Sequence, residues 1–254
     1  MLTALLRHDR TLVLAGLLAV ILLAWGYLLH GGGVAMEQMD MGGGQMMAMA
    51  PAWTPFYAML MVLMWAIMMM AMMLPSAAPA ILLVAALMRP SGGNTVFGST
   101  GLFVMGYLII WFGFSVVAVA LQWGLDRVEL LSADMASISA VLSGLLLIAT
   151  GIYQLTAWKQ ACLVQCRSPF DLITRSWRQG RLGPALAGMR HGLFCLGCCW
   201  MIMALLFVGG VMNLLWIAAI ALLVALEKLL PTGTRVSQIS GIVLMVWGTV
   251  VLIR

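Results

Sequence analysis

Charged residues are scarce in this sequence. Only 8% of its 254 residues are Asp, Glu, Lys or Arg, whereas a soluble domain carries about 25%. Hydrophobic residues make up 64% of the chain, and its mean hydropathy is +1.09. These values exclude a soluble globular fold, because water cannot be the main solvent of such a chain.

The apolar runs also lack the period-two alternation of a transmembrane β-strand. In hydrocarbon, each backbone polar group must be satisfied within a helix or a closed barrel, so these runs predict helices. Runs long enough to span a core of about 30 Å lie at 12–29, 57–74, 101–123, 138–158, 192–209, 212–230 and 236–253. The sequence therefore predicts an all-α transmembrane helix bundle with six to seven crossings.

Several functional motifs are absent. The chain has no G-x-x-x-x-G-K-[ST] phosphate loop and no phosphorylated-aspartate pump signature, so ATP-driven movement would need another subunit. It has no H-E-x-x-H motif and no nucleophile–base pair, and we expect no enzymatic activity. The 13 Lys and Arg residues fit membrane orientation better than nucleic-acid binding.

The basic residues predict an orientation in a bacterial inner membrane. With the N-terminus in the cytoplasm, the inner segments hold 11 of the 13 basic residues, and the outer segments hold only Arg127 and Arg254. Residues 1–30 then form an N-terminal anchor, or alternatively a cleaved signal peptide, since basic residues precede the run and small residues follow it. Residues 31–56 form a periplasmic segment.

Residues 57–254 form the predicted helix bundle, with a cytoplasmic loop at 159–190. This loop carries apolar side chains among arginines, which favours contact with anionic lipid. The apolar side chains are Phe170, Leu172, Ile173 and Trp177.

The outer segment is rich in methionine and glycine and has no apolar periodicity. Its methionines are Met36, Met39, Met41, Met46, Met47 and Met49. A thioether is a soft, neutral ligand that favours Cu(I), and Glu37 and Asp40 would attract cations. The segment therefore predicts metal capture, with a disordered linker of biased composition as the alternative.

Residues 57–88 predict one long helix that bends at Pro75, where a backbone donor is missing. Met61, Met64, Met68 and Met72 follow steps of three and four residues and share one face of this helix. Such a face could carry soft metal inward as a ladder of ligands. Methionine also fills irregular gaps between helices, so packing is the alternative.

Five cysteines fall in two groups on the predicted inner side: Cys162 with Cys166, and Cys195 with Cys198 and Cys199. The spacings of three and four residues let each group present two sulfurs on one helix face. Two such pairs could form a tetrahedral Zn site or a Cu(I) site of lower coordination, and copper is the favoured metal. Plain burial of small side chains and thiol redox chemistry are the alternatives.

Two further residues could support such a site. A hairpin around 209–213 brings Glu227 to the depth of Cys195, where it could accept thiol protons or instead pair with Lys228 or Arg235. His191 could add a nitrogen ligand, or it could be an interfacial residue at a helix start.

Several blocks of the sequence are recognisable together: AMMLPS at 71–76, YQLTAWKQACLVQCRSP at 153–169, CLGCCW at 195–200, GVMN at 210–213 and EKLLP at 227–231. Over 57–254 the chain resembles a bacterial family with a domain of unknown function, described as predicted metal-binding integral membrane proteins. The resemblance implies a multi-helix inner-membrane protein with a cysteine metal site. The methionine-rich segment lies outside the matched blocks.

The leading hypothesis is a copper-handling protein that captures the ion at the outer methionines and passes it to the inner cysteines. Uptake and delivery to a partner metallochaperone or metalloprotein both fit. The alternatives are a membrane scaffold that loads a partner metalloprotein, and a thiol-redox membrane protein. Besides this partner we expect the lipid bilayer and no nucleic acid, and self-association into a homo-oligomer stays open.

Overall fold

The computed structural model describes residues 2–33, 37–40, 46–49, 52–88, 93–132, 135–137, 139–168 and 182–254. The helices are α1 (Leu2–Leu29), α2 (Pro55–Met88), α3 (Gly93–Arg127), α4 (Ala140–Leu155), α5 (Ala157–Arg167), α7 (Gly183–Ala204), α8 (Leu206–Gly209), α9 (Leu214–Leu229) and α10 (Gly233–Ile253). Strands β1 (Glu37–Asp40) and β2 (Met46–Met49) form a small hairpin. Apart from this hairpin, the predicted all-α bundle is confirmed.

Within the described ranges, five helices are long and apolar enough to cross a membrane: α1, α2, α3, α7 and α10. The number becomes six if α4 and α5 form one bent span. The chain is thus a membrane protein, and the prediction of six to seven crossings agrees at its lower end. The sixth predicted run, 212–230, corresponds to α9, whose 16 residues extend only about 24 Å as a helix.

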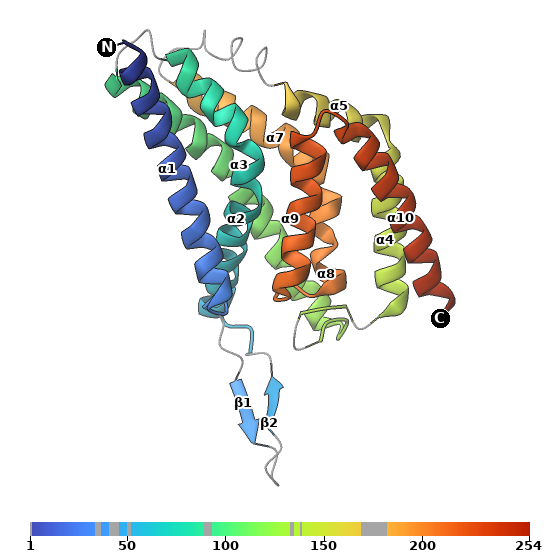
Figure 1. Ribbon diagram of the computed structural model, residues 1–254. Coiled ribbons are helices and arrows are strands. Elements are labelled where there is room, and N and C mark those ends of the chain that lie inside the picture. Colours follow the sequence, from blue (N-terminus) through green and yellow to red (C-terminus); the bar gives the residue numbers. More distant parts are fainter. Residues whose placement is uncertain are drawn as a thin grey trace.

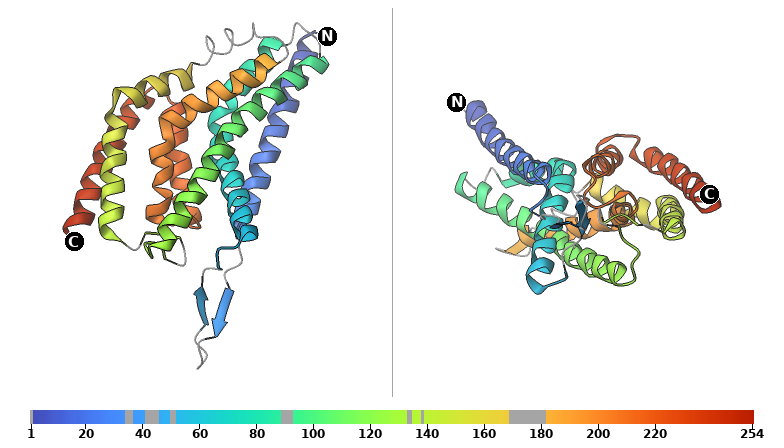
Figure 2. Two further views of the ribbon diagram at one scale, coloured as in Figure 1. Left: turned by 180° about the vertical axis from the view of Figure 1, so that it is seen from behind. Right: turned by 90° about the horizontal axis from the view of Figure 1, so that it is seen from below.

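The helices run between two ends of the bundle (Figure 1). The N-terminus, α5 and the connection from α9 to α10 lie at one end, while the hairpin, α8 and the C-terminus lie at the other (Figures 1 and 2). Helix α1 packs on α2, α2 on α3, α3 on α7, and α4 on α10. Which end faces the cytoplasm, and whether the first segment is cleaved, stay predictions.

Two of the basic residues counted for orientation do not lie at a membrane surface. Lys159 is fully buried, and Lys228 is only 8% exposed. Removing these two from the 11 inner residues leaves 9 against the outer Arg127 and Arg254. The asymmetry survives, but the two lysines belong to the interior of the bundle and need partners there.

Glycines bring two helix pairs into backbone contact. A Cβ at Gly106 of α3 would overlap the backbone of α7 at Ala185, and a Cβ at Gly188 of α7 would overlap the backbone of α3 at Phe103. In the pair α4–α10, a Cβ at Gly151 would lie 2.6 Å from the carbonyl oxygen of Gly241. Small residues are the usual means by which membrane helices approach closely, since lipid offers no hydrophobic drive for association.

Helix α2 is continuous over 34 residues and contains Pro75 and Pro79, which confirms one long helix, while the bend at Pro75 stays a prediction. Just before the first proline, the carbonyl of Met73 accepts a hydrogen bond from the Ser76 hydroxyl at 2.9 Å and one from the Tyr107 hydroxyl at 3.4 Å. Side-chain hydroxyls thus supplement the backbone bonding in the proline region, which stabilises it inside the bundle.

The fourth predicted crossing does not continue straight through its cysteines. Helix α4 ends at Leu155, and α5 turns away from it by 66°. Thr156 causes the break: its hydroxyl donates to the Tyr153 carbonyl at 2.7 Å and accepts from the backbone N–H of Lys159 at 3.3 Å. One side chain therefore ends the first helix and caps the second.

The outer methionine segment is partly a paired hairpin rather than an irregular loop. In the antiparallel register Met39 is opposite Met47, Glu37 is opposite Met49, and Asp40 is opposite Met46. Met36 and Met41 lie outside the described residues, as do Phe170, Leu172, Ile173 and Trp177. For these, the predictions of metal capture and lipid contact stay predictions.

Candidate metal centre

Helix α7 carries three buried cysteines, Cys195, Cys198 and Cys199. The helix begins at Gly183 with a proline in its first turn, where the missing N–H costs no hydrogen bond. It therefore starts nine residues before the predicted run at 192. The cysteines lie well inside the helix and face the core of the bundle.

Helix α5 brings the second cysteine group onto α7. The sulfur of Cys198 lies 3.8 Å from the sulfur of Cys166. The sulfur of Cys162 packs over the backbone of α7, since a Cβ at Gly197 would lie 2.9 Å from it. All five thiols are free. The structure thus brings together the two groups that the sequence singled out, and their role as metal ligands stays a prediction.

The ammonium of Lys228 lies beside the cysteine sulfurs. Its Nζ donates to Cys195 Sγ at 2.8 Å and lies 3.9 Å from Cys199 Sγ. It is also 3.4 Å from the Ser76 hydroxyl and 3.8 Å from Met73 Sδ. Within the described ranges, no carboxylate oxygen comes within 4.0 Å of this ammonium. Cys195 is its closest neighbour, so an anionic sulfur is the natural counter-charge.

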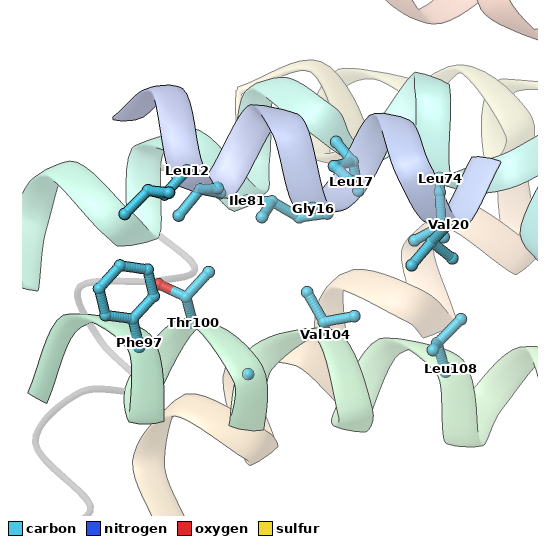
Figure 3. A pocket seen from close by; sticks show the side chains of 12 residues that line it. Leu12, Gly16, Leu17, Val20, Leu74, Ile81, Phe97, Thr100, Val104 and Leu108 are labelled. Atoms are coloured by element: carbon cyan, nitrogen blue, oxygen red, sulfur yellow. The ribbon is translucent and has the colours of Figure 1, made fainter. Parts of the chain in front are cut away.

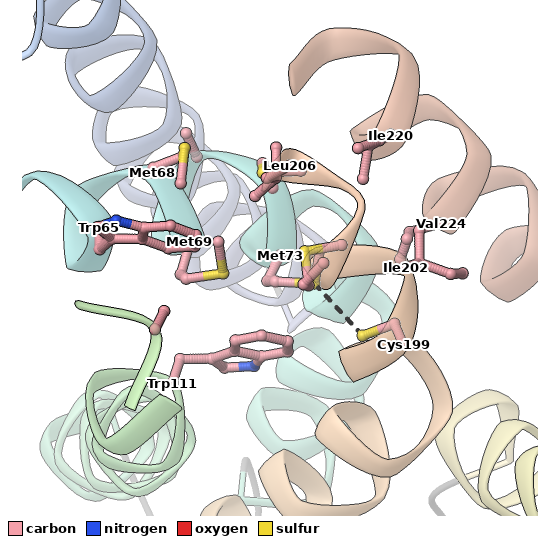
Figure 4. Close-up of a cluster of buried hydrophobic side chains, with 14 of the residues drawn as sticks. Trp65, Met68, Met69, Met73, Trp111, Cys199, Ile202, Leu206, Ile220 and Val224 are labelled. Atoms are coloured by element: carbon pink, nitrogen blue, oxygen red, sulfur yellow. Dashed lines mark hydrogen bonds between the residues drawn. The ribbon is translucent and has the colours of Figure 1, made fainter. Parts of the chain in front are cut away.

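Two more side chains complete this sulfur centre, by which we mean Cys195, Cys199, Met73, Lys228 and Tyr107. The Tyr107 hydroxyl lies 3.0 Å from Cys195 Sγ. Cys199 Sγ lies 4.0 Å from Met73 Sδ, and Figure 4 shows these two side chains pointing toward each other between α7 and α2. The centre therefore combines two thiols and one thioether with a cation and a hydroxyl.

The predicted methionine ladder lies in the apolar core. Met64, Met68 and Met72 are at most 1% exposed and belong to the main hydrophobic cluster. Figure 4 shows Met68 and Met69 on α2, before Met73. The methionine beside the cysteines is Met73, the neighbour of the predicted Met72. Full burial among apolar side chains agrees with the packing alternative, and ligation by the other three stays a prediction.

Glu227 is next to the centre along the chain but turns away from it. Its carboxylate accepts from Lys159 Nζ at 2.6 Å and from Gln154 Nε2 at 2.8 Å. Of the two alternatives for Glu227, the ion pair with Lys228 or Arg235 is therefore wrong, and acceptance of thiol protons stays a prediction. Successive helix residues point about 100° apart, so α9 sends Glu227 toward α4 and α5, and Lys228 toward α2 and α7.

His191 is buried, with 3% of its surface exposed, and it is not the interfacial residue at a helix start that the sequence allowed. Its ring packs against the rings of Phe103 and Tyr107, with centroids 5.8 and 5.7 Å apart. Its Nδ1 has no hydrogen-bond partner among the described residues. The histidine thus supports Tyr107, which itself contacts Cys195.

In the described part of the chain, no group of three or more His, Cys, Asp or Glu side chains is arranged as a ready metal cage. A structural Zn site is four-coordinate and tetrahedral, so the arrangement does not favour zinc. Soft thiolate and thioether donors select Cu(I), and a bridge between two sulfurs needs fewer preset ligands. The donor set fits copper better.

The groove between α1, α2 and α3 is a different kind of space. It holds about 350 Å³ and is lined by apolar side chains with the single hydroxyl of Thr100 (Figure 3). It offers no soft metal donor. Because no cysteine, methionine or histidine in the described part of the chain lines this groove, the sulfur centre is the better candidate for a metal site.

Sequence reasoning missed Tyr107 and Met73 and misplaced Lys228. The signals were present but ambiguous. A lone basic residue inside an apolar run at 212–230 was a marker of a functional site, and we had assigned it to the membrane surface. Met73 is one of eight methionines between positions 59 and 73, and only the rotation of α2 selects it.

Comparisons with known proteins agree with this chemistry. The model of a family described as PpoB2, copper chaperone, matches residues 62–251. No curated protein and no solved structure matches the chain.

Proposed function

The chain belongs to the copper chaperone family, and we propose that it binds Cu(I) at the sulfur centre and delivers it to a partner protein. The resemblance to a metal-related membrane family agrees with this membership at that coarser level, although the matching family carries a different name. A chaperone role is non-catalytic. It fits a chain in which we found no catalytic motif.

The observation that carries the proposal is the position of Lys228 beside Cys195 and Cys199. Cu(I) bound by two thiolates forms a complex with one net negative charge. Burying this charge in a membrane bundle is costly unless a cation lies beside it. The ammonium supplies that cation, so a copper dithiolate at this centre would be neutral overall.

Delivery also needs a source of copper, and the methionines offer one. Met39, Met46, Met47 and Met49 lie in the hairpin at the far end of the bundle from α5, on the side that we predict to be periplasmic. The methionine face of α2 runs from that end toward Met73. Capture at the hairpin and transfer along α2 to the cysteines is the route that we propose.

The deciding experiment is copper analysis of the purified full-length protein in detergent after loading with Cu(I). After a wash with a chelator that removes copper held by thioethers alone, we expect about one Cu(I) per chain in the wild type and none in the variant with all five cysteines replaced by serine, because a neutral hydroxyl cannot replace a thiolate. A matched variant, Met59→Leu, changes an exposed methionine and should bind copper as the wild type does. A wild type without copper after loading would refute the proposal.

A further inference from the structure

A pocket opens next to the sulfur centre at the end of the bundle that holds the N-terminus and α5. It has a volume of about 540 Å³. Its lining comes from α2, α5, α9 and the residues that follow α5 and α9: Pro79, Val164, Arg167, Ser168, Lys228 and Pro231, together with Leu229. No residue of this set carries a negative charge.

Lys228 belongs to both the pocket and the sulfur centre. Its side chain lines the pocket, and its Nζ contacts Cys195 and Cys199 on the inner side. The side chain of Lys228 therefore lies between the pocket and the buried sulfurs, and no cysteine of the described ranges lines the pocket itself. The second cation, Arg167, is held at the pocket by a hydrogen bond from its guanidinium to the Pro231 carbonyl at 2.9 Å.

Among the described residues, no carboxylate forms an ion pair with Arg167 or Lys228, and two such cations at one pocket favour an anionic ligand. Cu(I) is a soft ion that thiolates bind in preference to water or carboxylate, and a carrier that holds it with two thiolates is an anion. The volume is sufficient for a small thiol complex or for the tip of a cysteine-bearing loop. Free Cu⁺, by contrast, would be repelled by Arg167 and Lys228.

We infer that this pocket is the port through which Cu(I) is exchanged as an anionic dithiolate complex, with Arg167 attracting the complex and Lys228 guiding it to Cys195. The inference rests on the proposed function of the sulfur centre. It adds the chemical form in which copper passes between this chain and its carrier.

The exchange conserves atoms and charge. In the loading direction, two Cu–S bonds to the carrier break, and two Cu–S bonds to Cys195 and Cys199 form; delivery to the partner follows the same steps in reverse. Cys195 enters as the thiolate paired with Lys228, and Cys199 enters as a thiol. One carrier sulfur leaves as a thiolate, and the other leaves with the proton from Cys199. Copper remains Cu(I) throughout, so no oxidant or reductant is needed.

The test compares two copper donors with the full-length protein in detergent under anaerobic conditions. One donor is Cu(I) in excess mercaptosuccinate, an anionic thiolate complex, and the other is the cationic acetonitrile complex of Cu(I). We expect Arg167→Gln to slow transfer from the mercaptosuccinate complex by about 10-fold, the lower range of electrostatic steering. Transfer from the acetonitrile complex should not slow. Added salt should reduce the wild-type rate from the anionic donor alone.

Arg127→Gln is the matched control, since it removes a cation that stacks on Trp123 at the end of α3 away from the pocket. It should leave both rates unchanged. Lys228→Met should slow the anionic donor further and also weaken Cu(I) binding, whereas Lys228→Arg should keep most of the rate. If the wild type binds Cu(I) from the acetonitrile complex but Arg167→Gln transfers from both donors at the wild-type rate, the port is refuted and the sulfur centre stands. If the wild type binds copper from neither donor, the proposed function itself fails.

Discussion

The two buried lysines of this bundle belong to contacts at adjacent positions of α9 and have different kinds of partner. Lys159 pairs with the carboxylate of Glu227 at 2.6 Å, within a polar network that also includes Gln154 of α4 and Ser240 of α10. Lys228, the next residue after Glu227, contacts the sulfur of Cys195 at 2.8 Å. One lysine is neutralised by a hard oxygen anion that stays in place. Lys228 is paired instead with the sulfur of Cys195, a soft donor that can also bind a metal ion.

This difference separates structure from function within one turn of α9. A buried ion pair holds helices in position, because removal of either partner leaves an uncompensated charge. An ammonium beside thiols serves a further purpose. The thiols can release protons when they bind copper, and the ammonium remains beside them to balance the charge of the complex. We therefore expect changes near Lys159 to affect folding, and changes near Lys228 to affect copper.

The largest effect is expected from Glu227→Gln. This change keeps the shape of the side chain but leaves Lys159 buried without its counter-charge, which should lower the free energy of unfolding by about 3–5 kcal/mol. Denaturant or thermal unfolding in detergent would measure the loss. The double variant Lys159→Met with Glu227→Gln should recover most of it, and a single variant as stable as the wild type would contradict the structural role of the pair.

An intermediate effect is expected from the neighbouring methionines of α2. Met73→Leu removes the thioether beside Cys199 and should weaken Cu(I) binding by about 10-fold, or 1.4 kcal/mol. Met72→Leu should leave the affinity unchanged, and each variant should lose less than about 1.5 kcal/mol of stability, because the volumes match. Competition with a Cu(I) chelator would measure both. Equal affinities in the two variants would show that Met73 packs without ligating.

The smallest effect is expected from Tyr107→Phe, which removes the hydroxyl beside Cys195. One hydrogen bond contributes about 1 kcal/mol, so the Cu(I) affinity should fall by about 5-fold in the same chelator assay. Tyr153→Phe is the control. The Tyr153 hydroxyl also contacts α7, the helix that carries Cys195, but it donates to the carbonyl of Gly197 rather than to a sulfur. A larger effect of Tyr153→Phe on copper would mean that helix position, and not the hydroxyl, controls the site.

Much of the architecture follows from the sequence because hydrophobic length and cysteine spacing are strong local signals. Hydrophobic length predicted the continuity of α2 through Pro75. Cysteine spacing predicted that the two cysteine groups lie against each other. The break at Thr156 was not predictable in this way, because threonine fits inside an apolar helix as well as at its cap. The hairpin was hidden by a glycine-rich segment without alternating apolar residues.

The composition of the sulfur centre was harder to predict than its location. The choice between Glu227 and Lys228, and between Met72 and Met73, depends on the rotation of α9 and α2 about their axes. A rotation of about 100° exchanges one residue for its neighbour. That rotation is set by contacts with helices far along the chain, such as the Lys159–Glu227 pair, which no local pattern encodes.

The glycine contacts between α3 and α7 have a mechanical consequence. Gly106 and Gly188 leave no room for a side chain between the two backbones, so close packing fixes α3 and α7 relative to each other. Tyr107 lies on α3 and Cys195 lies on α7, so this close packing also fixes the spacing between their side chains. Lys228 reaches Cys195 from α9 on a side chain with four rotatable bonds, so its ammonium can stay beside the sulfurs by small adjustments of this side chain while the two helices keep their positions.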